Sequence, residues 1–147
     1  MKIRVIVAGK PALAYAKSAV DEYLKRLTRL GGCELIIVKA GTSEEVSARL
    51  LERSEGCFRI CMDERGMDLT TRKFSERIEE LELRGDVKAV AFLIGAADGH
   101  TEALRASCDL LIRVSPFTLQ HELALVVLLE QLYRIASLRA GMPYHRD

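Results

Sequence analysis

Three consecutive residues near the end of the chain combine an aromatic ring, a titratable ring and a guanidinium: Tyr144, His145 and Arg146. Arginine binds phosphate through two parallel hydrogen bonds, and all three residue types stack on exposed bases. We therefore regard them as candidates for binding a nucleic-acid substrate. The alternative is a frayed chain end, which is the usual state of terminal residues.

Three other segments that could bind a ligand each follow an apolar run: residues 62–66, 95–100 and 115–121. The middle segment begins at Gly95 and carries no bulky side chain over five positions, so a ligand can approach its backbone. Backbone N–H and C=O groups of such loops can read the edge of an adenine, and apolar side chains such as Met62, Phe117 and Leu119 could cover its faces. The alternatives are a tight turn for the middle segment and core packing for Met62 and Phe117.

For two polar residues of the last predicted helix, we take a structural role as the first explanation. His121 stands at the start of this helix, where it could orient a loop or act as a base. Glu130 lies among apolar residues and needs a partner, and Arg134 one turn later predicts an i,i+4 ion pair.

The elements that must position these residues alternate between strands and helices. Apolar runs predict strands at 3–8, 34–39, 58–62, 87–94 and 109–114, and helical spacing or caps predict helices at 11–30, 42–53, about 74–85, 101–107 and 121–140. Residues 63–66 are predicted to form a polar loop, and Thr42 with Glu45 has capping-box spacing. Alternation predicts an α/β fold in one domain, residues 1–147, with a mainly parallel sheet. The carboxyl ends of its strands would bring the three segments to one edge.

The last predicted helix is apolar on nearly every side, from Leu123 to Leu132. A helix with little polar surface must be covered on most sides. We therefore expect a second subunit to supply part of the cover.

Composition excludes several classes of function. The chain has 147 residues, a net charge of +1 and 49% hydrophobic residues, so only a local basic patch could bind nucleic acid. Four cysteines (Cys33, Cys57, Cys61, Cys108) form no C-x-x-C pair and have no histidine nearby in sequence, which argues against a metal site and favours reduced thiols. No apolar run approaches membrane-spanning length and no signal-peptide pattern is present, so we expect a cytoplasmic protein.

The chain resembles the RlmH-type ribosomal RNA methyltransferases of the SPOUT superfamily over essentially its whole length. The resemblance rests on ordered motifs at residues 63–66, 93–99, 115–121, 130–134 and 144–146. It implies a Rossmann-like sheet with a C-terminal deep trefoil knot, and a homodimer. It also implies S-adenosylmethionine as methyl donor and N3-methylation of a pseudouridine in helix 69 of 23S rRNA, with the assembled ribosome as substrate.

The resemblance also implies site residues. It assigns the methyl-donor site to Met62, Gly95, Val114, Ser115, Pro116, Phe117, Thr118 and Leu119. In the mechanism that we expect from it, His145 assists removal of the N3 proton. Arg146 would then bind phosphate or neutralise the developing imide charge, and His121 would shape the donor loop.

Three positions depart from the family pattern: Ala96, Gln120 and Leu125 stand where glycine, proline and arginine are common. Ala96 is tolerable if its φ is negative, and the loss of the arginine removes a possible phosphate or cofactor contact. Two alternatives therefore stay open. One is a non-catalytic dimeric α/β binding protein, and the other is a SPOUT methyltransferase with a different RNA target such as tRNA.

Overall fold

The computed structural model describes residues 1–147 as five strands and five helices that alternate along the chain. In order they are β1 (Lys2–Ala8), α1 (Ala14–Thr28), β2 (Glu34–Val38), α2 (Ser43–Arg53), β3 (Phe58–Met67), α3 (Thr71–Arg84), β4 (Ala89–Ile94), α4 (Glu102–Ala106), β5 (Leu110–Ile112) and α5 (His121–Arg139). Every strand and helix expected from the sequence is present. The predicted capping box of α2 is confirmed, because Thr42 and Glu45 exchange side-chain and backbone hydrogen bonds.

The five strands form one sheet with the order β2-β1-β4-β3-β5, and every neighbouring pair is parallel. The predicted parallel α/β fold is therefore confirmed. All six residues of β4 are buried, as expected for a central strand that is covered on both faces.

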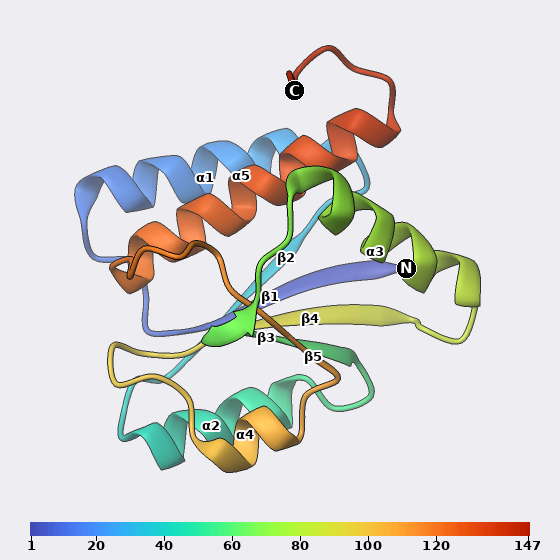
Figure 1. The fold of residues 1–147 in the computed structure, drawn as a ribbon. Coiled ribbons are helices and arrows are strands. Elements are labelled where there is room, and N and C mark those ends of the chain that lie inside the picture. The colour runs from blue at the N-terminus through green and yellow to red at the C-terminus, as the bar shows by residue number, and fades with distance from the viewer.

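Helices cover both faces of the sheet and produce three layers (Figure 1). Helices α1, α3 and α5 lie on one face, and α2 and α4 lie on the other. A cluster of 18 buried residues fills the space beneath the first group, and a second cluster of nine lies beneath α2 and α4. Alternate residues of β4 enter the two clusters: Phe92 faces the larger cluster and Leu93 the smaller one.

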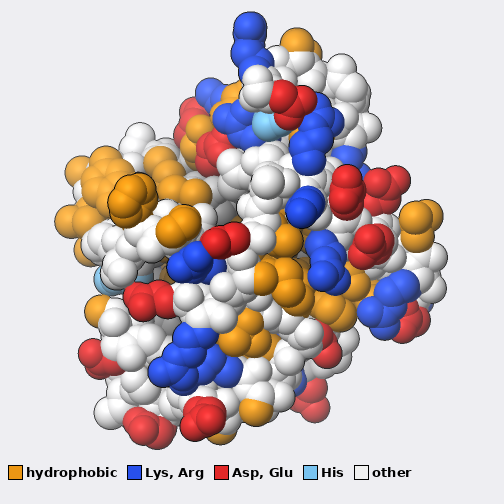
Figure 2. Space-filling model, in the orientation of Figure 1, with side chains coloured by type: hydrophobic (Ala, Val, Ile, Leu, Met, Phe, Trp, Pro, Cys, Tyr) orange, Lys and Arg blue, Asp and Glu red, His pale blue; other side chains and the backbone are white.

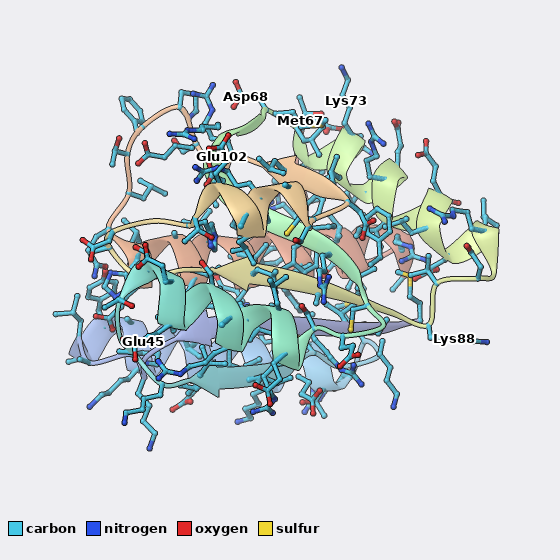
Figure 3. The ribbon with its side chains drawn as sticks, turned by 90° about the horizontal axis from the view of Figure 1, so that it is seen from below. Glu45, Met67, Asp68, Lys73, Lys88 and Glu102 are labelled. Atoms are coloured by element: carbon cyan, nitrogen blue, oxygen red, sulfur yellow. The ribbon has the colours of Figure 1, made fainter.

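The prediction of a polar loop at residues 63–66 is wrong, because β3 continues through them to Met67. The register shifts within this stretch, so that Met62 and Met67 both face Ile112 of β5. A Cβ on Gly66 would lie 2.5 Å from the backbone carbon of Ile112, so only glycine allows this approach. Figure 3 shows Met67 and Asp68 at the end of β3, where the chain turns towards α3. The last part of β3 can carry polar side chains because residues 64 and 65 are exposed to solvent.

No helix of the structure is long and apolar enough to cross a membrane.

Candidate functional site

A cavity of about 470 Å³ lies at the carboxyl ends of β3, β4 and β5. Small-molecule sites typically measure about 300–1,000 Å³, so this volume suits a nucleoside-sized ligand. Its wall is built from residues 62–65, 94–100, 113–115 and 117–121, with Arg105 and Ala124. The sequence-based expectation that three segments gather at one edge of the sheet is confirmed.

Most of the residues expected to hold the methyl donor line this cavity. They are Met62, Gly95, Val114, Ser115, Phe117, Thr118 and Leu119. Pro116 is not among the lining residues. Phe117 lines the cavity but is 81% exposed, so most of its ring lies open to solvent.

A neighbouring ring leaves little room for a side chain at Gly95. A Cβ at this position would lie 3.0 Å from Cε1 and 3.1 Å from Nδ1 of His100, closer than ordinary side-chain contacts. The next residue, Ala96, needs no glycine, because no non-glycine residue of the structure has a positive φ. This removes the conformational objection to alanine at position 96.

Sequence reasoning gave no role to His100, which lines the cavity. The residue is only 9% exposed, and its Nε2 lies 3.1 Å from the carbonyl oxygen of Met62. Burial lowers the pKa of His100, although the nearby Asp63 carboxylate opposes this effect. The imidazole is therefore neutral at pH 7, and its proton lies on Nε2 because a carbonyl oxygen only accepts. Nδ1 is the one buried side-chain nitrogen or oxygen atom without a hydrogen-bond partner. A single histidine at the end of a loop gives no sequence signal for this arrangement.

An ion pair with little exposure supports the same wall. Nη1 of Arg105 lies 3.1 Å from Oδ2 of Asp63, and their side chains are 16% and 8% exposed. The same Nη1 donates to the carbonyl oxygen of His100 at 2.8 Å, and the backbone N–H of Arg65 donates to Oδ1 of Asp63 at 2.8 Å. Arg105 thus ties α4 to both β3 and the loop after β4.

The start of α5 forms the other side of the cavity. Gln120 caps this helix by accepting a hydrogen bond from the N–H of Leu123 at 3.1 Å. His121 lines the cavity and is half-buried, with Nδ1 3.4 Å from the side-chain amide of Gln120.

Glu122 ties the start of α5 to the segment before α1. Its Oε1 accepts hydrogen bonds from the backbone N–H groups of Ala12 and Leu13 at 2.5 and 3.1 Å. Burial by itself would raise the pKa of Glu122, but these two N–H groups offset that effect and leave the pKa below its usual value.

Apolar side chains gather beside this junction, on the left of Figure 2. Leu13, Tyr15 and Phe117 are among the most exposed large apolar residues. The hydroxyl of Tyr15 lies 3.4 Å from Oε1 of Gln120, so α1 and the 115–120 loop meet here.

The 144–146 motif does not lie at the cavity. No residue of the 141–147 segment lines the cavity, and in Figure 1 this segment turns back over the C-terminal half of α5, away from the cavity loops at the start of that helix. One chain therefore does not bring His145 or Arg146 to the cavity.

The predicted ion pair of Glu130 with Arg134 is confirmed at 2.8 Å.

No group of three or more His, Cys, Asp or Glu side chains is arranged to hold a metal ion.

Comparisons with known proteins agree on one family. A family model described as "Predicted SPOUT methyltransferase" matches residues 1–145. The chain is 49% identical over 146 residues to the Ribosomal RNA large subunit methyltransferase H of Thermus thermophilus, with 99% of each chain covered.

Two solved structures have similar folds. A probable methyltransferase from Bordetella pertussis aligns with a TM-score of 0.60 and 16% identity, covering 92% of this chain and 96% of that one. The SpoU methyltransferase AviRb from Streptomyces viridochromogenes, in complex with AdoMet, aligns with a TM-score of 0.50 and 16% identity, covering 96% and 59%.

Proposed function

The chain belongs to the SPOUT methyltransferase family, and from this membership we propose that it is an S-adenosylmethionine-dependent methyltransferase of large-subunit ribosomal RNA. The observation that carries the proposal is the cavity at the carboxyl ends of β3, β4 and β5. Seven of the eight residues expected to hold the methyl donor line it, in a chain that is 49% identical to a named rRNA methyltransferase.

The residues of the cavity fit S-adenosylmethionine. The loop after β4 offers a backbone that no bulky side chain covers, with Gly95 at its start. Met62 and Leu119 offer apolar surface for an adenine, and Ser115 and Thr118 offer hydroxyl groups. When bound there, S-adenosylmethionine supplies a methyl group activated by a sulfonium, and the electron pair of the broken C–S bond stays on sulfur. The enzyme then has mainly to position the acceptor in line.

For the acceptor we propose N3 of a pseudouridine in helix 69 of 23S rRNA, with the assembled ribosome as substrate. The name of the Thermus thermophilus relative, which specifies the large subunit, supports this assignment. The net charge of this chain, +1, also agrees with the assignment. It indicates that the protein would recognise its substrate by shape rather than by strong overall charge attraction.

We propose further that the protein is a cytoplasmic homodimer of one domain, residues 1–147, whose C-terminal part is knotted. The exposed side chains of Leu13, Tyr15 and Phe117 support a second subunit near the cavity. Helix α5 also supports a second subunit. Its apolar residues Leu123 and Val127 remain half-buried although the helix packs against α1 and α3, so part of its apolar surface is left uncovered.

His145 and Arg146 are the proposed catalytic residues, and Tyr144, His145 and Arg146 the proposed RNA-binding residues. Since these residues lie far from the cavity of their own chain, the segment of the partner subunit would have to complete the site. Arg146 is exposed and has no ion-pair partner, so its guanidinium is free to meet a phosphate or an imide anion.

Calorimetric titration with S-adenosylmethionine tests the proposal at its cavity. We expect one binding site per chain in the wild type and greatly weakened binding in Gly95→Val, whose side chain would meet the His100 ring. Leu83→Ala is the matched control, because Leu83 is 80% exposed on α3 and does not line the cavity. Absence of binding to the wild type would contradict the proposal.

A further inference from the structure

The 141–147 segment is folded back along α5 by a well-defined helix end. After α5, the N–H of Gly141 donates to the carbonyl of Leu138 at 3.1 Å, and the N–H of Met142 donates to the carbonyl of Ser137 at 2.9 Å. With Gly141 at a φ of 73°, this pair of bonds is a Schellman motif, which reverses the chain direction. The residues that follow are thus directed back towards α5.

Tyr144 fixes the next part of the segment. Its ring packs edge-on against Tyr133 with centroids 4.7 Å apart, and the guanidinium of Arg134 lies 4.6 Å from its centroid. Its hydroxyl donates to Oε1 of Glu130 at 3.4 Å and lies 3.5 Å from the hydroxyl of Tyr23. Aromatic and cation–π contacts of this kind hold a side chain in one place.

His145 is held through both ring nitrogens. Nδ1 lies 3.3 Å from Nη1 of Arg134, and Nε2 lies 2.9 Å from Oδ1 of Asp147. The guanidinium of Arg134 can only donate, so Nδ1 must accept. The carboxylate of Asp147 can only accept, so Nε2 carries the proton. The two partners together select one neutral tautomer of His145, whose side chain is 9% exposed.

Asp147 is in turn held by α3. Arg72 donates from Nε to Oδ1 at 3.0 Å and from Nη2 to Oδ2, a two-bond geometry that fixes the plane of the carboxylate. Hydrogen bonds from Arg72 and then from His145 lower the pKa of Asp147 to about 2, so it is ionised at any working pH. Lys and Arg side chains gather around this segment at the top of Figure 2.

We propose that Asp147, oriented by Arg72, is a positioning residue that makes Nδ1 of His145 the atom that receives the N3 proton of the RNA base. The inference rests on the proposed function and deepens it. As N3 gains the methyl group, its proton passes to Nδ1, and the resulting imidazolium keeps its Nε2–H bond to the Asp147 carboxylate. The carboxylate thus compensates the new positive charge and prevents the tautomer in which Nδ1 is already protonated.

The other charged groups that face His145 are compatible with this role. Arg134 is the only cation within hydrogen-bond distance of the ring, and Glu130 compensates it through bonds at 2.6 to 2.8 Å. The 3.3 Å separation of Nη1 from Nδ1 is longer than the usual bond, so an imide N–H can replace Arg134 there. Tyr144 remains neutral, because burial raises its pKa.

Nitrogen-15 NMR of histidine-labelled protein tests the tautomer directly. The chain has only three histidines, and His145→Gln assigns the signal. We expect a proton on Nε2 in the wild type and a mixture of tautomers in Asp147→Ala and Arg72→Gln. Arg84→Gln is the matched control, because its ion pair with Asp86 has nearly the same exposure as the pair of Arg72 with Asp147, and we expect no change in it. A wild-type signal with the proton on Nδ1 would overturn the inference.

Single-turnover methylation of ribosomes that lack the modification tests the consequence. We expect Asp147→Ala to lower the rate at saturating ribosomes about tenfold, less than the roughly 10² to 10⁴ that a positioned base contributes, because His145 itself is kept, while S-adenosylmethionine binding stays unchanged. An unchanged rate in Asp147→Ala or in His145→Gln would overturn the proton-acceptor role. If the wild type methylates no ribosome, the proposed function itself fails, whereas wild-type activity with unaffected variants rejects only this inference.

Discussion

Replacing Arg105 by methionine should show how much the fold of the cavity wall depends on one ion pair. Methionine keeps much of the apolar length of arginine but removes its charge and all its hydrogen bonds. The variant leaves Oδ2 of Asp63 without its partner at 3.1 Å and the carbonyl of His100 without its donor at 2.8 Å.

The expected cost follows from the burial of the pair. Removing one partner of a buried ion pair costs about 3–5 kcal/mol, because the remaining charge is left uncompensated. Asp63 is only 8% exposed but keeps the N–H of Arg65 at 2.8 Å, so we expect the lower end, about 3 kcal/mol. For a chain of this size that corresponds to a fall in Tm of about 6–12 °C.

Urea denaturation and thermal melting, followed by calorimetric titration with S-adenosylmethionine, measure the effect. The double variant Asp63→Asn with Arg105→Met should recover at least about half of the lost stability, because no charge remains buried. Arg84→Met, which breaks an exposed pair, should leave the midpoint nearly unchanged and the ligand affinity intact. A loss below about 1 kcal/mol in Arg105→Met, or simple additivity in the double variant, would refute the reasoning.

Three further predictions concern single positions. Gly66→Ala should destabilise the fold by about 3 kcal/mol, since its Cβ would meet the β5 backbone at 2.5 Å, and a melting temperature equal to wild type would count against this. Ala96→Gly should change the S-adenosylmethionine affinity in calorimetry by no more than about twofold, because position 96 has no positive φ; a tenfold gain would show that alanine is strained. The lowered pKa of Glu122 contributes stability that is present above about pH 4.3 and is lost as the pH falls through the folded-state value, so Glu122→Gln should be less stable than wild type at pH 7 and the difference should shrink as the pH falls below about 4.3 in urea titrations. A stability difference that grows as the pH falls below about 4.3 would contradict the last of these.

Local patterns were sufficient to predict most of the fold. The strands and helices follow from apolar periodicity, because each element buries one face or, for β4, both faces. The capping box of Thr42 with Glu45 and the pair of Glu130 with Arg134 depend only on residues three or four apart, so they too are visible in the sequence.

The features that the sequence did not predict depend on contacts between distant segments. The extension of β3 through Gly66 requires β5 beside it, and the sequence contains no signal for the register shift. The role of His100 depends on the carbonyl of Met62 in β3, 38 residues away, and on the missing side chain of Gly95 just after β4. The network of His145, Asp147 and Arg72 likewise joins residues 75 positions apart.

The cavity itself was partly predictable. The carboxyl ends of parallel strands meet at one edge, so the three segments were expected together, and they do gather there. The exposure of Phe117 and the absence of Pro116 from the lining were not foreseen, because the path of the 115–120 loop depends on the cap of α5 and on Tyr15.

The central claim is most directly tested by mass spectrometry of rRNA nucleosides and fragments after ribosomes lacking the modification are incubated with the protein and S-adenosylmethionine. We expect one methyl group per ribosome, on N3 of a pseudouridine in helix 69 of 23S rRNA, and none on tRNA supplied in the same reaction. Methylation of tRNA alone, or no methyl transfer to either RNA, would contradict the account.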